Sequence, residues 1–290
     1  MEIIPVAFDS MGARSQCTFV KCRNLNIIID PAAELGPSRY GLSPHKTEIK
    51  KCAELKEKIK DYLKKSDAII ITHYHFDHIP DFNDIKSYEL FKGKKVFVKN
   101  CAENINASQK SRASKFRKIM KELDIGFEEA DSRSFNLNGV EIKFSAPVFH
   151  GEIKTRLGYV IMVSIKEGNK KFVFGSDAQG PIDKTAQDFV INENPDTAVL
   201  DGPISYMLHY RLSQENFELA KKALENILKN TKSLKTLVYE HHLVRDLKYR
   251  EKYRRQFELA DRLKIKLVTA AEYLGIKNNF LEAERKSLFS

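Results

Sequence analysis

Tryptophan is absent from this sequence of 290 residues, and no apolar run approaches the length that would cross a lipid bilayer. The chain starts Met1-Glu2-Ile3-Ile4-Pro5, without a basic region followed by a long apolar run, so we expect no signal peptide. The four cysteines form no C-x-x-C pair and no zinc knuckle. These absences argue against a membrane protein or a secreted disulfide scaffold, and we expect a cytoplasmic protein with reduced cysteines.

The composition that remains is that of a folded, basic protein. Apolar residues make up 42% of the chain, which is enough for a sizeable core, so disorder is not expected. The formal net charge of +10 favours anionic partners, nucleic acid among them. No short-period repeat, low-complexity segment or linker interrupts the sequence, so we predict a single domain over residues 1–290.

Short β-branched or aromatic runs alternate with amphipathic stretches along the chain. The runs typical of strands are 3–8, 17–20, 25–29, 68–71, 96–98, 140–144, 159–165, 171–174, 197–200, 234–239 and 267–269. Four stretches are typical of helices. The first begins near Ser43, which can cap it, with Pro44 in its first turn, and the third covers 214–229 with Ser213 as its cap. The second and the fourth are basic and cover 106–121 and 247–264. The turn sequence Glu167-Gly168-Asn169 predicts a hairpin between 160–165 and 171–174.

A histidine-rich segment follows the apolar run 68–71. It offers three imidazoles and a carboxylate within six positions, as His73, His75, Asp77 and His78. Neutral imidazole and carboxylate suit a borderline metal such as Zn²⁺. Because these groups stand where a strand ends and a turn begins, they can point toward one centre. A metal site explains the segment better than a polar turn that happens to be rich in histidine.

Polar residues also end three later strands. His150 follows the run 140–144, Asp177 follows 171–174, and His241 with His242 follows 234–239. A sheet places the ends of its strands side by side, so these groups can meet the first cluster although they are far from it in sequence. Together they are numerous enough for two metal ions that share a bridging carboxylate.

The order His73-x-His75-x-Asp77-His78, then His150, then Asp177, then a histidine after a later strand, resembles the metallo-β-lactamase superfamily. The similarity extends from Asp30 to His241. It implies a mixed α/β fold, the four-layer αββα metallo-β-lactamase sandwich, with the metals at one edge between two sheets. It also implies two zinc ions as the cofactor, with manganese or iron as alternatives.

The resemblance assigns each ligand to a position in this chain. The implied ligands of the first ion are His73, His75 and His150. Those of the second ion are Asp77, His78 and His241, with Asp177 as the bridge between the ions.

Two residues next to this set have supporting roles in the same comparison. Asp30 resembles the family aspartate that supports the site from outside the ligand set. The last ligand is either His241 or His242. We favour His241, because it follows its strand as His73 does and because Arg245, four residues later, resembles an arginine of RNase Z-like members. His242 is then a residue that faces the substrate or supports a ligand.

Several residues and segment lengths differ from those of known branches of the superfamily, which argues against membership in those branches. His75 stands where the flavodiiron branch has glutamate, and Asp177 stands where true β-lactamases have cysteine. The stretch from Asp177 to His241 is too short for the extra domain of β-CASP nucleases, and that from His150 to Asp177 is too short for the tRNA-gripping arm of RNase Z. The chain resembles an archaeal branch of the superfamily with some RNase Z-like features.

The function that the resemblance implies is a metal-dependent hydrolase, in which a hydroxide bridged between two zinc ions attacks an ester, a thioester or a phosphodiester. In this hypothesis Asp77 is catalytic as well as a ligand, because it orients the nucleophile by accepting its proton. The alternatives are an RNA or DNA phosphodiesterase, and a mononuclear iron oxygenase of the same fold or a relic site. We expect a small anionic or ester substrate, with nucleic acid as the alternative partner and no membrane; the oligomeric state is left open.

Basic residues bear on the choice between these substrates. The helix predicted over 106–121 carries Lys110, Arg112, Lys115, Arg117, Lys118 and Lys121. These positions cannot all share one face, but Arg117 and Lys121 can share a stripe that would hold phosphates if it borders the metal cleft. A solvated helix face is the other interpretation. Arg14 is a candidate for a substrate anion or a surface residue, and His45 and His209 are expected to be structural.

Overall fold

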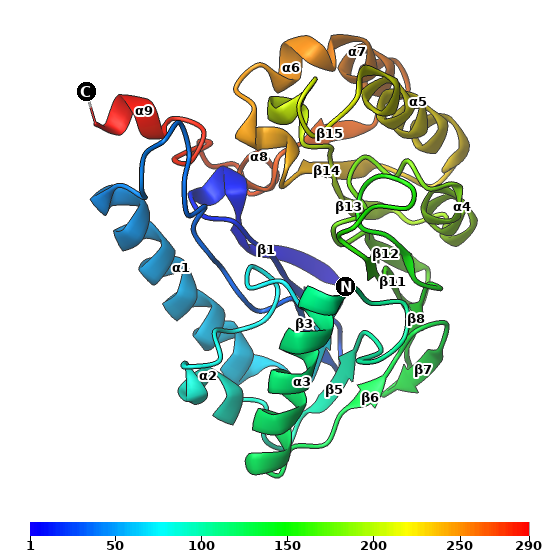
Figure 1. Ribbon diagram of the computed structural model, residues 1–290. Helices are drawn as coiled ribbons and strands as arrows, with labels where there is room; N and C mark the ends of the chain where they lie inside the picture. The colour runs from blue at the N-terminus through cyan, green and yellow to red at the C-terminus, as the bar shows by residue number, and fades with distance from the viewer. Residues whose placement is uncertain (290) are drawn as a thin grey trace.

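The isoleucine-rich runs of the N-terminal half form the centre of a six-stranded sheet in the computed structural model, which describes residues 1–289 (Figure 1). In spatial order its strands are β1 (Glu2–Phe8), β2 (Gln16–Lys21), β3 (Asn26–Ile29), β4 (Ala68–Ile71), β5 (Lys95–Val98) and β6 (Glu128–Glu129). Strands β3 to β6 run parallel. All four residues of β4 are buried, as in a parallel strand covered on both faces.

The C-terminal half supplies most of a seven-stranded sheet. In spatial order its strands are β15 (Lys266–Val268), β14 (Thr236–Glu240), β13 (Thr197–Asp201), β12 (Lys170–Phe174), β11 (Val163–Glu167), β8 (Val140–Phe144) and β7 (Ser134–Leu137). Strands β12 to β15 are parallel, and β12, β11, β8 and β7 are joined antiparallel. A separate pair, β9 (Val148–Phe149) with β10 (Tyr159–Val160), lies between two of these strands in sequence.

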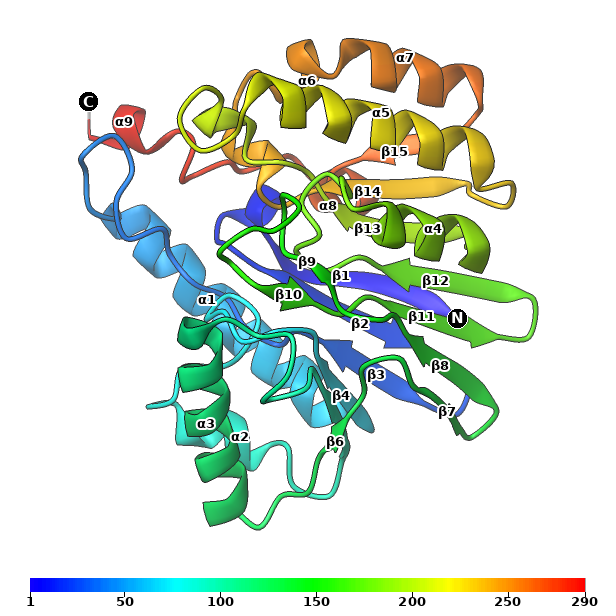
Figure 2. The same cartoon turned by 45° about the vertical axis from the view of Figure 1, so that its right-hand side comes forward.

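Helices cover the outer face of each sheet, which gives the four layers of an αββα sandwich (Figures 1 and 2). On the side of the six-stranded sheet are α1 (Lys46–Lys65), α2 (Ile85–Glu89) and α3 (Ala107–Glu122). On the side of the seven-stranded sheet are α4 (Lys184–Glu193), α5 (Gln214–Asn230), α6 (Tyr249–Lys252) and α7 (Arg254–Arg262). The short helices α8 (Ala270–Tyr273) and α9 (Arg285–Leu288) belong to the C-terminal segment. This architecture is the one that the resemblance implied.

Aromatic residues join the two sheets face to face. The ring of Phe97 on β5 lies 4.4 Å from that of Phe135 on β7 and 5.9 Å from that of Phe144 on β8. A second apolar cluster fills the space between the seven-stranded sheet and its helices, where Leu224 and Ile227 of α5 are fully buried. Each such side chain stabilises the fold by roughly 1.5–3 kcal/mol, so the two cores hold the sheet edges in place.

Several predicted elements are confirmed and others need correction. The hairpin forms between β11 and β12, with Glu167 paired to Lys170. The run 159–165 is two strands in different sheets, β10 and β11. Between them the amide of Ile161 donates to the carbonyl oxygen of Thr72, the residue after β4, which interrupts the ladder. The helix predicted over 247–264 is two, α6 and α7, which meet at Tyr253.

The start of α1 also differs from the prediction that Ser43 caps it. The cap is His45, whose Nδ1 accepts from the amide of Thr47, while Glu48 accepts from the amide of His45. This reciprocal capping box satisfies two of the free amides at the helix start, so the helix begins after Pro44. His45 therefore has a structural role, as expected.

None of the helices within residues 1–289 combines the length and the apolar character that a membrane span requires. The assignment of residues 1–290 to a single domain stays a prediction.

Candidate metal centre

Four strand ends bring the polar residues of the sequence pattern to one edge of the sandwich. His73 follows β4 of one sheet, and Asp177 and His241 follow β12 and β14 of the other. His150 directly follows β9 of the separate pair, and not the run 140–144, which ends six residues earlier as β8. Asp30 and His241, which directly follow β3 and β14, have φ angles of 49° and 56°, and Ser176, two residues after β12, has a φ of 50°. This left-handed conformation is rare for residues other than glycine and turns the chain sharply as each strand ends. The sharp turns aim these side chains, or those next to them, at a common centre.

A first group of four side chains converges around His75. Its Nδ1 lies 3.1 Å from Nε2 of His73 and 3.1 Å from Nε2 of His150. The Oδ2 atom of Asp177 is 3.2 Å from Nε2 of His150 and 3.6 Å from Nε2 of His73. Three imidazole nitrogens and one carboxylate oxygen therefore face one point.

A second group lies on the other side of Asp177. Its Oδ1 atom is 3.1 Å from Nε2 of His78 and 3.6 Å from Nε2 of His241. Asp77 completes this group, with Oδ2 3.5 Å from Nε2 of His241 and Oδ1 3.9 Å from Nε2 of His78. The two oxygens of Asp177 are thus divided between the groups, which is the placement that a carboxylate shared by two ions requires.

The donor chemistry of both groups fits divalent metal ions. The ligand atoms in each can all lie within 4.8 Å of one another, and they are imidazole nitrogens and carboxylate oxygens. The Nε2 atom of His78 is buried and makes no hydrogen bond within residues 1–289, although Asp177 is near. A cation between these atoms would be held by imidazole nitrogens and carboxylate oxygens that already point toward one another.

Carboxylates outside the two groups hold the imidazoles. Oδ2 of Asp30 lies 2.8 Å from Nδ1 of His78, and Oδ2 of Asp9 lies 2.6 Å from Nδ1 of His241. In each case the carboxylate accepts from Nδ1, which leaves Nε2 to face the centre. Asp9 also accepts a hydrogen bond from Nε of Arg245 at 2.7 Å. Asp30 is therefore placed where the resemblance puts a supporting aspartate.

The two candidates for the last ligand, His241 and His242, differ in the residues that they contact. His241 directs Nε2 into the second group, whereas Nδ1 of His242 lies 2.8 Å from Oδ2 of Asp201 and the residue lines the cleft. His242 is still near the cluster, because a third group of nearby ligand atoms consists of Asp177, His241 and His242. The geometry favours His241, and its role as a ligand stays a prediction.

Charge balance within the centre depends on buried histidines. Burial acts against protonation of His78, but the carboxylates of Asp177 and Asp30 outweigh it and raise its pKa well above the usual range. Burial likewise opposes protonation of His241, yet Asp9 and Asp177 raise its pKa to about 10. Burial lowers the pKa of His73 to about 4, and the charge of His78 adds to this. Two imidazolium ions thus balance the carboxylates, and binding of a metal would release their protons.

Two residues at this centre were missed by sequence reasoning. Asp9 directly follows β1, so the strand-end pattern that was used for Asp177 and His241 could have found it. Gln16 begins β2, is fully buried, and donates from Nε2 to Oδ1 of Asp177 at 2.6 Å. Nothing in the sequence distinguishes Gln16 from an ordinary polar residue, because its partner is 161 positions away.

The centre opens into a cleft of about 890 Å³. From the two groups, His75, Asp77, His150 and Asp177 reach its surface. Arg14 also lines it, but both of its contacting nitrogens are 2.6 Å from Glu282, so its charge is already paired. The cleft gives a substrate access to one side of the metal centre.

Four of the six basic residues of α3 line two different hollows, and Lys110 and Lys115 line neither. Arg112 lines the cleft, whereas Arg117, Lys118 and Lys121 line a different hollow with Phe127. The stripe of Arg117 and Lys121 therefore does not border the metal centre. The physical reason is that Arg112 and Arg117 are five positions apart and lie on different sides of the helix.

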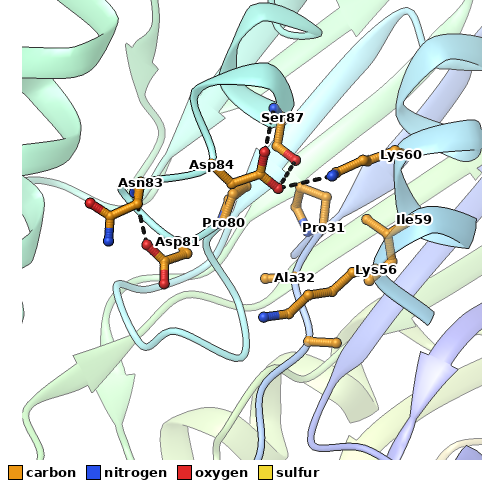
Figure 3. A pocket seen from close by; sticks show the side chains of 11 residues that line it. Pro31, Ala32, Lys56, Ile59, Lys60, Pro80, Asp81, Asn83, Asp84 and Ser87 are labelled. Atoms are coloured by element: carbon orange, nitrogen blue, oxygen red, sulfur yellow. Dashed lines mark hydrogen bonds and ion pairs between the residues drawn. The ribbon is translucent and has the colours of Figure 1, made fainter. Parts of the chain in front are cut away.

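A further hollow of about 420 Å³ lies between α1 and the segment that follows His78 (Figure 3). Lys60 extends from α1 toward Asp84, to which it is 3.1 Å distant, and Pro31 and Pro80 form part of the wall. None of the converging histidines or of Asp77 and Asp177 lines this hollow. It is thus separate from the candidate metal centre.

Comparison with known proteins agrees with this architecture. The sequence profile of a family described as "Beta-lactamase superfamily domain" matches residues 26–227. A UPF0282 protein of Methanocaldococcus jannaschii is 42% identical, over 99% of this chain and 96% of its own length.

Two solved structures share the fold at 13% sequence identity. A possible metal-dependent hydrolase from Veillonella parvula has a TM-score of 0.58, over 89% of this chain and 94% of its own. The metallo-beta-lactamase fold protein YhfI from Bacillus subtilis has a TM-score of 0.56, over 93% and 95%. At this identity the structural likeness establishes the fold alone. The sequence matches go further: this chain belongs to the metallo-β-lactamase superfamily and, within it, to the UPF0282 proteins.

Proposed function

We propose that the protein is a hydrolase that works with two divalent ions, zinc in the first place and manganese or iron as alternatives, and that it cleaves an ester or a phosphodiester. The observation that carries this proposal is the division of Asp177 between two groups of ligand atoms. A single structural metal would need only one of these groups. Neither group is closed by a fourth protein side chain of its own, because Asp177 is shared, and such open sites are typical of catalytic metals.

The residues have distinct roles in this proposal. Those that would hold the first ion are His73, His75 and His150, those for the second are Asp77, His78 and His241, and Asp177 would serve both. Divalent ions held by these residues would supply a hydroxide nucleophile, by lowering the pKa of bound water toward neutrality, and would polarise the scissile bond.

Asp77 is the carboxylate best placed to handle the proton of the attacking water. Its side chain is 16% exposed and lines the cleft, whereas that of Asp177 is 1% exposed. Burial would raise the pKa of Asp77, but the neighbouring His78 and His241 hold it well below its ordinary value. The carboxylate is therefore ionised and can accept a hydrogen bond from water, which orients the water toward the substrate.

Substitution of Asp77 by alanine tests the proposal. We expect the Asp77→Ala variant to fold, to retain the metal of the first group, and to lose most of the second metal and nearly all turnover. Metal content by mass spectrometry, with hydrolysis of p-nitrophenyl acetate and bis-p-nitrophenyl phosphate, measures both. Asp81→Ala is the matched control, because Asp81 is an exposed carboxylate four residues away on the separate hollow. Full metal content together with full activity in Asp77→Ala would contradict the proposal.

The alternative of a mononuclear iron oxygenase uses one group of ligands. It leaves unexplained why Asp77, His78 and His241 converge as a second group and why Asp30 and Asp9 orient two of them. The hydrolase proposal accounts for both groups. An RNA or DNA phosphodiesterase is the second candidate, and the observation in its favour is that Arg112 of the basic helix lines the cleft.

A further inference from the structure

Of the arginines that line the cleft, some form ion pairs with carboxylates and others do not. Arg14 is bound to Glu282, and Nε of Arg245 lies 2.7 Å from Oδ1 of Asp9. The other three arginines of the cleft have no carboxylate oxygen within 4.0 Å in the part of the chain that the structure describes; they are Arg112, Arg156 and Arg211. Three arginines without an ion pair in residues 1–289 thus line the cleft that leads to the candidate metal centre.

Arg112 is the most constrained of the three. Its guanidinium lies 5.0 Å from the ring centre of Phe76, and its Nη1 is 3.4 Å from the carbonyl oxygen of Tyr74. Tyr74 and Phe76 flank His75, so Arg112 is held against the segment that carries the first group of ligands. The side chain is half-buried, and burial lowers its pKa while the nearby charge of Asp77 acts in the opposite direction. Within residues 1–289 its one hydrogen-bond acceptor is the carbonyl oxygen of Tyr74, so its other N–H groups can donate to an anion in the cleft.

Arg156 is on a loop that is tied to the same helix. Nδ2 of Asn106 donates to the carbonyl oxygen of Arg156 at 2.8 Å, and Nε2 of Gln109 donates to that of Leu157 at 2.7 Å. These bonds attach the loop to the N-terminal turn of α3, and Arg112 lies further along the same helix. Two of the three free guanidiniums therefore belong to one connected unit, although they are 44 positions apart in the sequence.

Arg211 comes from a third segment, after β13. Its amide donates to Met207 at 2.9 Å, and Met207 lines the cleft together with Ile204 and Tyr206. The wall from which Arg211 projects is mainly apolar. A substrate in the cleft would meet positive charge from several directions and an apolar surface on one side.

We propose that the substrate is a phosphate ester, an inference that rests on the proposed function. Its phosphate oxygens would bind Arg112 together with Arg156 and Arg211. Guanidinium groups that come from separate segments can each donate to a different oxygen of one phosphate, whereas a carboxylate offers two oxygens in one plane. The ester's organic group would lie on Ile204, Tyr206 and Met207. In the hydrolysis, water supplies the oxygen that joins phosphorus, and the leaving oxygen departs as an alcohol that takes up a proton.

The first test measures binding without catalysis. Inorganic phosphate is titrated calorimetrically into metal-free full-length protein, with acetate at matched ionic strength as the comparison. We expect phosphate to bind and acetate to bind at least about tenfold more weakly. We also expect Arg112→Gln to weaken phosphate binding by about tenfold or more, the factor that corresponds to one charge-assisted hydrogen bond. Arg117→Gln is the control, since Arg117 is on the same helix but outside the cleft, and it should leave binding unchanged.

Three results of this titration would overturn the proposal: no phosphate binding by the wild-type protein, equal binding of phosphate and acetate, or equal binding by Arg112→Gln. A circular dichroism spectrum identical to the wild type's shows that the Arg112→Gln variant is folded. Binding that falls in Arg117→Gln rather than Arg112→Gln would also overturn it, and would favour a nucleic acid on the other face of α3.

A second test uses the metal-loaded enzyme and two substrates with one leaving group. We expect Arg112→Gln to lower kcat/KM for bis-p-nitrophenyl phosphate at least about tenfold more than for p-nitrophenyl acetate, because the acetate ester is neutral. An equal loss for both substrates would contradict a phosphate site. If neither substrate were hydrolysed by the wild-type protein, the proposed function would fail while phosphate binding in the metal-free protein still decided this inference.

Discussion

At the scale of single residues, the centre is organised around Asp177. Its two oxygens face different groups of ligand atoms, and Gln16 donates to one of them. Burial would raise the pKa of Asp177, but the charges of His78 and His241 outweigh it and hold that pKa well below its ordinary value. A carboxylate that stays ionised while fully enclosed is suited to hold positive charge on both sides.

The choice between His241 and His242 as a ligand is tested through the carboxylates that hold them. Asp9 lies 2.6 Å from Nδ1 of His241, and Asp201 lies 2.8 Å from Nδ1 of His242. Because supporting carboxylates orient metal-bound imidazoles, we expect Asp9→Asn to weaken binding of the second metal by about 10–100-fold and Asp201→Asn to have a much smaller effect. Competition with a coloured chelator measures both affinities. The reverse order would identify His242 as the ligand.

Gln16 should also support metal binding, because its Nε2 donates to Oδ1 of Asp177 at 2.6 Å inside the protein. We expect Gln16→Leu to reduce the affinity for metal by roughly tenfold, within the range for residues that hold a ligand. Gln214→Leu is the control, since Gln214 is exposed at the start of α5 and contacts Glu218. The same chelator competition applies, and unchanged affinity in Gln16→Leu would remove Gln16 from the support of the centre.

At the scale of elements, the ends of strands decide where the ligands point, and helices hold the strands. Helix α4 illustrates this, because sequence reasoning did not predict it. Its last residue, Glu193, accepts from Lys143 of β8, Ser164 of β11 and Lys171 of β12 at 2.6, 2.9 and 3.1 Å. These contacts fasten the helix to three adjacent strands of the seven-stranded sheet, and β12 leads to Asp177.

The contribution of Glu193 to stability should depend on pH. Burial alone would raise its pKa, but the bonds from Lys143, Ser164 and Lys171 outweigh burial and lower it from the ordinary value of 4.5. A lowered pKa in the folded state means that the stabilisation is present above pH 4.5 and is lost as the pH falls through the folded-state pKa. We therefore expect Glu193→Gln to reduce the free energy of unfolding at pH 7 and to have a progressively smaller effect as the pH falls below 4.5. Urea unfolding at several pH values measures this, and a loss that is independent of pH would contradict it.

At the scale of the whole molecule, the C-terminal segment fastens the wall of the cleft. Arg285 is fully buried and forms two bonds of 2.8 Å to Glu48 of α1. It also donates to the carbonyl oxygens of Gly36 and Leu42, at 2.8 and 3.0 Å. Because Leu35 and Pro37 line the cleft, residues at the end of the chain hold a loop from its beginning in place beside the candidate metal centre.

Removal of one partner from this ion pair should be strongly destabilising. We expect Arg285→Met to lower the free energy of unfolding by about 3–5 kcal/mol, because Glu48 would be left as a buried charge without a cation. Lys286→Met is the control, since Lys286 is the exposed neighbour of Arg285 and should cost little. Urea unfolding of metal-free protein measures both variants. A loss in Arg285→Met as small as that in Lys286→Met would show that the ion pair is not important for stability.

The sequence by itself determined the fold family and the candidate ligands that meet at the centre. The motif from His73 to His78 is local, so its spacing after β4 is visible without coordinates. The later residues His150, Asp177 and His241 each follow a strand-like run, and strands of a sheet end at a common edge. Apolar runs were sufficient to place most strands. Helix α4 was missed although Asp183 caps it and Ala186 and Val190 recur at helical spacing, and the division at Tyr253 between α6 and α7 was missed as well.

Tertiary structure alone decided which distant side chains support the centre and which cations face the substrate. Gln16 reaches Asp177 across 161 positions, Asp9 reaches His241 across 232, and Arg285 reaches Glu48 across 237. No local pattern encodes such pairs, since each depends on how the two sheets pack. The same holds for α3, where one helix presents Arg112 to the cleft and Arg117 to another face. Helical geometry predicts that the two cannot share a face, but only the packing of α3 against the sandwich determines which of them lies beside the metals.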